Sequence, residues 1–378
     1  MRIEPFALER YQSIWENRVA WNVSESGVHP LRVADLVDTS GAHDALLQAE
    51  LGYPQTNGTA ELREAIAAMY PGAGPAHVQV TNGGSEANCV LLMRLVEPGD
   101  ELVVMMPNYM QVPGLARALG ATVRPWWLRQ TGSGAAAWQP DLDELASLVT
   151  PATRAIVICN PNNPTGARLD APVLDAVCRA AERVGAWVIG DEIYRGAERL
   201  ADDTPSVWNR GYDRAVVTSG LSKAYGLPGL RIGWIVAPPD LVSDLWGVHD
   251  YTTIAPGALN DRLARVALEP SMRERLIART RMIIRTNYPL LCKWADKHGL
   301  THVPPDAGAI ALVRYPQDVR SLEIAEGLRR DHSVLVVPGE FFEMDGWLRL
   351  GFGSDPAYLT SALTLIGEFL DTVGAHAR

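Results

Sequence analysis

One lysine stands among glycines, serines and an arginine directly after an apolar segment of the chain. The stretch is VTSGLSKAYGLPGLRIGW at residues 217–234, and it contains Lys223 and Arg231. A lysine amine that is kept partly deprotonated forms a Schiff base with a carbonyl compound. Arg231 adds a permanent planar cation that suits a phosphate. The pair therefore fits a phosphorylated aldehyde, with Lys223 at its carbonyl carbon and Arg231 at its phosphate.

Three further segments place polar side chains at the ends of apolar runs. They are VTNGGSEAN at 80–88, ICNPNNPTG at 158–166 and AWVIGDEIY at 186–194. Gly84 and Ser85 stand where a strand would hand over to a helix, and the free N–H groups at a helix start bind anions. The other two segments end at the sheet edge where open α/β folds bind ligands. A carboxylate there, such as Asp191, can keep the nitrogen of a bound heterocycle protonated.

These segments resemble the class I/II aminotransferase family of fold-type-I pyridoxal-phosphate enzymes, in order along nearly the whole chain. The resemblance implies pyridoxal 5'-phosphate as cofactor, bound to Lys223 as a Schiff base, and catalytic roles for Lys223, Asp191 and Tyr194. The cofactor ligands that it implies are Tyr53, Gly84, Ser85, Tyr109, Asn163, Asp191, Tyr194, Ser222, Lys223 and Arg231.

Further roles follow from the same resemblance. Tyr109 corresponds to the aromatic residue that stacks on the cofactor ring, and Asn163 and Tyr194 correspond to residues that bond its phenolate oxygen. Tyr53 corresponds to a tyrosine that reaches the phosphate of the neighbouring subunit, which implies a homodimer with composite active sites. Arg349, in RLGFG, corresponds to the arginine that grips the substrate α-carboxylate, and a bidentate guanidinium is well suited to that task.

The sequence departs from the family pattern at two places. Gly220 stands where many relatives carry a serine or threonine for the phosphate. The segment NVSESGVHP at 22–30 replaces a glycine-containing segment that lines the substrate, and Gly27 is expected to keep the backbone role. With HDYT and RLGFG, this segment resembles a branch of the family that cyclises a hydroxylated arginine. His29 would then be an added acid/base, so that His29→Ala keeps the cofactor but lowers turnover; a histidine that caps a turn is the competing interpretation.

Few residues of the sequence indicate which side chain the substrate carries. Glu16 and Glu25 suit a cationic side chain, and each also fits a solvated or structural acid. We expect Lys223 to act as acid and base at the substrate α-carbon, with a pKa depressed by desolvation and nearby cations.

Three functions are compared. The first is an aminotransferase that acts on an α-amino acid and a keto-acid acceptor. The second is a cyclase or lyase that acts on an arginine-like amino acid in specialised metabolism. The third is a ligand sensor without enzymatic activity, which the intact lysine, aspartate and arginine set disfavours.

Composition excludes several partners. The chain has 378 residues and a formal net charge of -10, which disfavours nucleic acid and anionic membranes because both need a basic face. It has no apolar run that would span a bilayer and no leader at Met1, so a cytoplasmic enzyme is expected. Cysteines without CxxC spacing predict reduced thiols and neither metal nor disulfide. They are Cys89, Cys159, Cys178 and Cys292.

Short apolar runs alternate with helical patterns through the middle of the chain, which is typical of parallel βαβ units. Expected strands lie at 101–107, 121–128, 154–160, 186–192, 214–219 and 231–237, and residues 130–139 are expected to form an exposed loop. The last third alternates helices with three strand-like segments. The predicted fold is a large α/β domain with a mostly parallel sheet, at 40–255, and a smaller α+β domain formed by 1–39 and 256–378.

Overall fold

The computed structural model of the chain describes residues 3–37, 39–131, 137–200 and 203–376. Its helices are α1 (Ala7–Trp15), α2 (Val33–Leu36), α3 (Ser40–Leu47), α4 (Ala60–Ala67), α5 (Gly84–Leu95), α6 (Gln111–Ala118), α7 (Leu142–Leu148), α8 (Ala171–Glu182), α9 (Pro239–His249), α10 (Ala258–Leu268), α11 (Pro270–Lys297), α12 (Ser321–His332) and α13 (Pro356–His376). Its strands are β1 (Trp21–Asn22), β2 (Val78–Thr81), β3 (Glu101–Met106), β4 (Thr122–Thr131), β5 (Ala137–Pro140), β6 (Thr153–Cys159), β7 (Trp187–Asp191), β8 (Ala215–Gly220), β9 (Gly233–Val236), β10 (Thr301–His302), β11 (Ile310–Arg314), β12 (Val334–Leu335), β13 (Val337–Pro338) and β14 (Trp347–Gly351).

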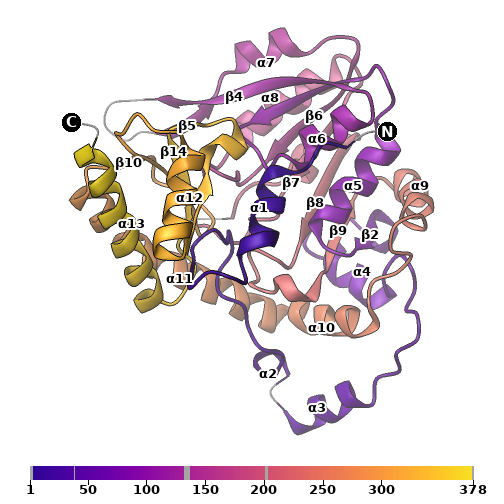
Figure 1. The fold of residues 1–378 in the computed structure, drawn as a ribbon. Helices are drawn as coiled ribbons and strands as arrows, with labels where there is room; N and C mark the ends of the chain where they lie inside the picture. Colours follow the sequence, from indigo (N-terminus) through magenta and orange to yellow (C-terminus); the bar gives the residue numbers. More distant parts are fainter. Residues whose placement is uncertain (1–2, 38, 132–136, 201–202, 377–378) are drawn as a thin grey trace.

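An eight-stranded sheet is the centre of the larger part of the molecule (Figure 1). Its strand order is β2-β9-β8-β7-β6-β3-β4-β5, and the pairs from β8 through to β4 are all parallel. Helices α5, α6 and α9 pack on one face of the sheet, and α4, α7, α8 and α10 contribute to the core on the other. β3, β6 and β8 are buried along almost their whole length, as strands covered on both faces must be.

All six expected strands are present, with ends shifted by one to three residues. The expected loop at 130–139 is partly wrong, because β4 continues to Thr131 and Ala137 begins β5, which pairs with β4 as an antiparallel hairpin. Trp138 of β5 is buried and its ring lies 5.8 Å from the ring of Trp347, so packing across the two parts of the molecule holds this segment as a strand. Residues 132–136 lie outside the described residues.

The smaller part contains an antiparallel sheet of order β10-β11-β14-β13 and a parallel pair, β1 with β12. The β1–β12 pairing joins Trp21 to Val334, so both ends of the chain share this part, as the predicted domain division requires. The division itself, at 40 and 255, stays a prediction. Asp355 accepts hydrogen bonds from the N–H groups of Ala357 and Tyr358 and so caps α13.

The segment from α2 through α3 to α4 extends away from the rest of the chain, at the bottom of Figure 1. Leu47 and Leu51 are each 79% exposed there, and Tyr53 is 85% exposed. Large apolar side chains on one projecting segment are a feature of a surface that another molecule covers. Separately, none of the described helices is long and apolar enough to cross a bilayer.

Candidate active site

A cavity of about 380 Å³ opens beyond the carboxyl ends of β7 and β8, with α1 and β14 contributing its other walls. It lies at the sheet edge where open α/β folds bind ligands. The predicted site residues that line it are Glu16, Gly84, Ser85, Tyr109, Asn163, Asp191, Tyr194, Ser222, Lys223, Arg231 and Arg349. Residues from seven separate stretches of the sequence therefore converge on one space.

The start of α5 and the guanidinium of Arg231 form one end of the cavity. Gly83, which precedes α5, has φ +90°, and a Cβ at this residue would lie 2.3 Å from Nη2 of Arg231. Glycine therefore allows the guanidinium to lie directly against the turn that leads into the helix. A helix N terminus beside an arginine is a strong phosphate site. The arrangement is the one that the phosphate-binding prediction for Gly84, Ser85 and Arg231 requires.

Gly220 is explained by crowding between β8 and β9. A Cβ at Gly220 would lie 2.8 Å from the carbonyl oxygen of Ile232, so a serine or threonine at this position would displace the backbone. The hydroxyl of Ser219 turns away and donates to the carbonyl oxygen of Glu192 at 3.2 Å. Ser222 lines the cavity, so it is the neighbouring hydroxyl that is placed to contact a phosphate.

Asp191 ends β7 and lies at the floor of the cavity. Its carboxylate accepts hydrogen bonds from Asn88 Nδ2 at 3.2 Å and from the Ile193 N–H at 3.1 Å. Burial raises the pKa of Asp191 although both hydrogen bonds lower it. Because a buried carboxylate of this kind lacks a cation, it suits a protonated ring nitrogen.

Tyr194 and Arg349 are fully buried and incompletely bonded. The Tyr194 hydroxyl and Nε of Arg349 have no hydrogen-bond partner within the described part of the chain. The guanidinium of Arg349 donates from Nη1 to Asn163 at 3.0 Å and from Nη2 to the carbonyl oxygen of Ser24 at 2.6 Å, and no described carboxylate pairs with it. Burial lowers the pKa of Arg349. An anionic ligand would relieve a buried cation that is bonded only to neutral oxygens.

Lys223 is paired with an acid from the N-terminal segment. Its Nζ lies 2.8 Å from Oε1 of Glu25. Burial alone would lower the pKa of Lys223, but the carboxylate of Glu25 and the nearby Tyr194 raise it. The expected depression of this pKa is therefore wrong for the free protein, because the sequence did not show that Glu25 would lie beside the lysine. The same contact lowers the pKa of Glu25 to about 2.

Three carboxyl groups besides Asp191 line the same cavity. Glu9 lies in α1, Glu16 directly follows α1, and Glu25 follows β1. Glu9 accepts a hydrogen bond from the hydroxyl of Tyr109 at 2.7 Å. Burial, helped by the charges of Glu25 and Glu9, raises the pKa of Glu16. We call Glu9, Glu16 and Glu25 the acidic wall; together with Arg349 it gives the cavity a cationic end and an anionic side.

Gly27 and His29 follow the acidic wall in sequence but differ in position. A Cβ at Gly27 would lie 3.5 Å from the carbonyl oxygen of Ser222 and 3.6 Å from Cδ of Lys223, so the backbone there borders the lysine. His29 is exposed and lines a different cavity, next to Arg279. Its Nδ1 lies 3.1 Å from the carbonyl oxygen of Gly353. The structure does not bring His29 to the lysine, and its catalytic role stays a prediction without geometric support.

Tyr53 lies outside the cavity of its own chain, on the projecting segment before α4. A residue that served a neighbouring subunit would occupy such a position, and so the structure of one chain leaves the role of Tyr53 a prediction.

Sequence reasoning missed Asn88 and Glu9. Asn88 lies one helical turn after Gly84 in α5, and residues four apart share a helix face, so this spacing could have indicated it. Glu9 lies seven residues before Glu16, which is also a same-face spacing. Neither spacing shows what the face packs against. Among the described residues, no group of three or more His, Cys, Asp or Glu side chains could hold a metal ion.

Comparison with known proteins places the chain in a family. The family model described as aminotransferase class I and II matches residues 40–366. Capreomycidine synthase of Streptomyces vinaceus is 36% identical over 376 residues, which cover 94% of this chain and 90% of that protein. A PLP-dependent aminotransferase from Streptococcus suis superposes with a TM-score of 0.91 at 31% identity, covering 99% of both chains. The PLP-dependent cyclase OrfR superposes with a TM-score of 0.89 at 29% identity, covering 98% of both chains.

The chain belongs to the aminotransferase class I and II family. It has the fold-type-I architecture and is a pyridoxal-phosphate enzyme, so the predicted fold class, cofactor and enzymatic nature are confirmed. The residues present fit that cofactor. The start of α5 and Arg231 suit its phosphate, and Asp191 suits its ring nitrogen. Lys223 and the Tyr194 hydroxyl, which has no hydrogen-bond partner among the described residues, line the same cavity.

Proposed function

We propose that this enzyme acts on an α-amino acid with a guanidinium-type side chain and closes a ring while the α-amino group is retained. The observation that carries the proposal is the contact between Glu25 and Lys223, with Glu9 and Glu16 lining the same cavity. Support for ring closure comes from the likeness to capreomycidine synthase and to the cyclase OrfR. The sequence alone put transamination first and cyclisation second; the likeness to capreomycidine synthase and OrfR favours the reverse order, and the acidic wall favours the cationic substrate.

The two ends of such a substrate match the two kinds of charge in the cavity. Arg349, held by Asn163 and bonded only to neutral oxygens, would bind the α-carboxylate. The acidic wall would bind the cationic side chain, and charge-assisted hydrogen bonds to carboxylates are the strong kind. Both ends being fixed, the α-carbon is oriented toward Lys223.

Proton transfer falls to Lys223 and Glu25. The cofactor, when bound, stabilises negative charge at the substrate α-carbon. Lys223 takes the α proton and must be neutral to do so, whereas Glu25 favours its charged form. A guanidinium that pairs with Glu25 weakens this effect and so favours the neutral amine. Lys223, once protonated, can give its proton to the side-chain hydroxyl, which departs as water. A guanidine nitrogen beside Glu25 then bonds to the carbon that lost the hydroxyl, and the proton that this nitrogen releases returns to the α-carbon.

Transamination of the same class of amino acid is the second candidate. It needs Lys223 alone as acid and base, and the likeness to the Streptococcus suis aminotransferase favours it.

The fate of the α-amine separates the two candidates. Purified protein loaded with pyridoxal phosphate would be mixed with arginine and with an arginine hydroxylated on its side chain, and the products analysed by mass spectrometry. We expect a product that is lighter by one water and keeps every nitrogen. A keto acid, with conversion of the cofactor to its amine form, would instead establish transamination. Turnover of neutral amino acids alone would contradict the cationic substrate class.

The proposed function extends to the oligomeric state of the enzyme and its place in the cell. We infer a homodimer in which Tyr53 of each subunit completes the other subunit's phosphate site, because Tyr53, Leu47 and Leu51 are exposed together on a projecting segment. The cysteines named above are unpaired, which suits the reducing cytoplasm that the composition predicts.

A further inference from the structure

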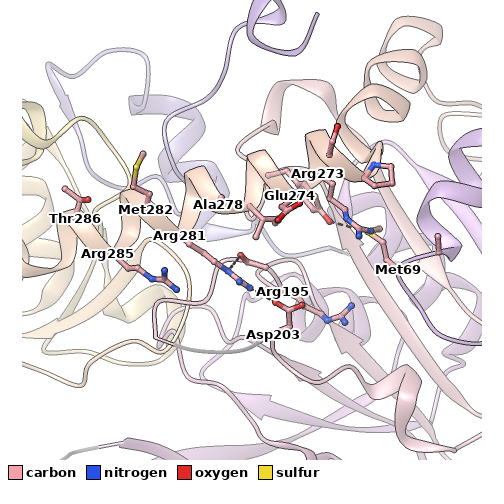
Figure 2. Close-up of a pocket in the computed structure, with 16 residues that line it drawn as sticks. Met69, Arg195, Asp203, Arg273, Glu274, Ala278, Arg281, Met282, Arg285 and Thr286 are labelled. Atoms are coloured by element: carbon pink, nitrogen blue, oxygen red, sulfur yellow. Dashed lines mark hydrogen bonds and ion pairs between the residues drawn. The ribbon is translucent and has the colours of Figure 1, made fainter.

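A second and larger cavity, of about 1090 Å³, lies between the first half of α11, the end of α4 and the segment after β7. It shares no lining residue with the cofactor cavity. Figure 2 shows Arg273, Arg281 and Arg285 on α11, with Arg195 and Asp203 facing them from the segment that follows β7. Four arginines and two acids line it, in a chain whose net charge is -10. A basic cavity in an acidic protein is a local reversal of charge that attracts anions.

Two of the four arginines are already engaged. Arg281 donates from Nη2 to Glu198 and to Asp203, and the charge of Asp203 also acts on Arg195. Arg285 donates from Nε to the carbonyl oxygen of Arg199 at 2.7 Å and is exposed. The remaining acid, Glu274, is exposed to solvent, where its charge is screened.

Arg273 and Arg195 keep donors without acceptors. Arg273 is half-buried and its side chain forms no hydrogen bond or ion pair with the described residues. Arg195 is half-buried as well, and its guanidinium lies 5.6 Å from the ring of Tyr70. Its one hydrogen bond to the described residues runs from Nε to the carbonyl oxygen of Thr204 at 3.0 Å. The charges of Glu192 and Asp203 act on Arg195, but its guanidinium forms no hydrogen bond with either carboxylate within the described part of the chain.

Tyr225 adds a buried donor to the same cavity. Its side chain is 7% exposed, and its hydroxyl donates to Sδ of Met69 at 3.3 Å, a thioether that is a weak acceptor. Arg273 and Arg195 both act on its charge, since each lowers its pKa while burial raises it to about 12. The Tyr225 phenol and the guanidinium groups of Arg273 and Arg195 thus line one space, and within the described part of the chain neither guanidinium is hydrogen-bonded to the carboxylates of Asp203 and Glu274 that line it too.

We infer that this cavity binds a small dianion, such as phosphate or a dicarboxylate, held by Arg273 and Arg195 with the Tyr225 hydroxyl as the third donor. Planar guanidinium groups bind phosphate and carboxylate oxygens in pairs, which matches two arginines and one ligand. Tyr225 lies two residues after Lys223, so the bound anion contacts the loop that carries the cofactor lysine.

Isothermal titration of the holoenzyme tests the inference without any activity measurement. The cofactor occupies its own phosphate site in the holoenzyme, whereas Arg349 can still accept a carboxylate of succinate, so the comparison of variants at the second cavity decides where the probes bind. We expect saturable binding of one or both probes at constant ionic strength. Arg273→Gln should weaken it roughly tenfold, the size of a lost charge-assisted contact, and Tyr225→Phe should weaken it less. Lys293→Gln removes a charge from an exposed position of α11 outside the cavity and should change nothing.

The inference is overturned if neither probe binds saturably, or if Arg273→Gln and Lys293→Gln bind the probes equally well. Circular dichroism and the visible band of the bound cofactor would show that each variant is folded and loaded. Because Arg273 and Tyr225 are altered separately, a folding failure in one leaves the other to decide.

Discussion

At the scale of single residues, the contact that distinguishes this site is the one between Glu25 and Lys223. The two residues are 198 positions apart in the chain, and their side chains meet at 2.8 Å. The contact holds the lysine charged and the glutamate ionised, which sets the protonation state from which the enzyme must start.

Replacing Glu25 should change how Lys223 responds to pH. The Glu25 carboxylate raises the pKa of Lys223, so in Glu25→Gln this pKa falls and a larger fraction of the amine is neutral at a given pH. The rate at which the apoprotein captures pyridoxal phosphate should then rise at pH 8, by about tenfold for each unit of pKa lost, and its pH midpoint should move down. Stopped-flow absorbance measures this rate.

The matched control for Glu25→Gln is His29→Ala, which removes a titratable side chain outside the cavity. We expect it to capture the cofactor at the wild-type rate and to keep turnover. A strong loss of turnover in His29→Ala would restore the catalytic role that the sequence suggested. An unchanged pH midpoint in Glu25→Gln would mean that the carboxylate does not control the lysine.

At the scale of elements, the start of α5 is tied to the loop after α9. Glu86, in the first turn of α5, accepts hydrogen bonds from the Asn82 N–H and from the hydroxyls of Thr252 and Thr253, and it pairs with the fully buried His249 at 3.3 Å. Burial alone would raise the pKa of Glu86, but these partners lower it to about 2. One carboxylate thus fixes the turn that forms the phosphate end of the cavity.

Glu86→Ala should therefore cost about 2 kcal/mol of unfolding free energy at pH 7, because it leaves the buried His249 and the partly buried Asn82 N–H without this partner. Since the pKa of Glu86 is lower in the folded chain, its contribution is fully present above the ordinary carboxyl pKa and is lost as pH falls toward 2. Urea denaturation at a series of pH values would show the difference from wild type shrinking between about pH 4.5 and pH 2.

Glu64→Ala, at an exposed position of α4, is the control for Glu86→Ala and should change stability little. A loss at Glu86 no larger than the loss at Glu64 would show that the network does not stabilise the turn.

The strands differ in how well the sequence pattern alone predicted them. The parallel strands were predictable because strands covered on both faces are continuous apolar runs. β5 was not predictable, because the sequence TGSGAAAWQP is typical of a loop. The contact between Trp138 and Trp347, which the sequence does not show, makes part of this segment a strand. From the sequence, Gly220 indicates only that a phosphate-binding hydroxyl is missing. The structure shows that β9 lies too close to this residue for any side chain to fit.

At the scale of the whole molecule, the exposed apolar segment around Tyr53 indicates that one chain is an incomplete unit. Tyr251, which lies after α9, is 89% exposed and adds to the unpartnered aromatic surface. A two-fold dimer would cover the same surface on both chains.

Mixing two inactive variants tests this assembly. Lys223→Ala lacks the cofactor lysine and Tyr53→Ala lacks the proposed partner contact, so each should be nearly inactive alone. A mixed dimer would have one intact site, and after refolding equal amounts together we expect about one quarter of wild-type activity. Light scattering would give the dimer mass. No recovery of activity in a verified mixed dimer, or a monomeric wild-type mass, would refute the composite site.

The sequence by itself determined the fold class, the cofactor and the set of residues that could hold it. Each of these depends on local patterns, namely apolar runs, glycine turns and polar residues at strand ends, that keep their meaning wherever the rest of the chain goes. Only the tertiary structure decided which acids face the lysine, that His29 lies apart from it and that Glu9 joins the acidic wall. The N-terminal segment carries no pattern that states its packing partner, because β1 pairs with β12 more than 300 residues away, and that pairing positions the segment from which Glu25 reaches Lys223.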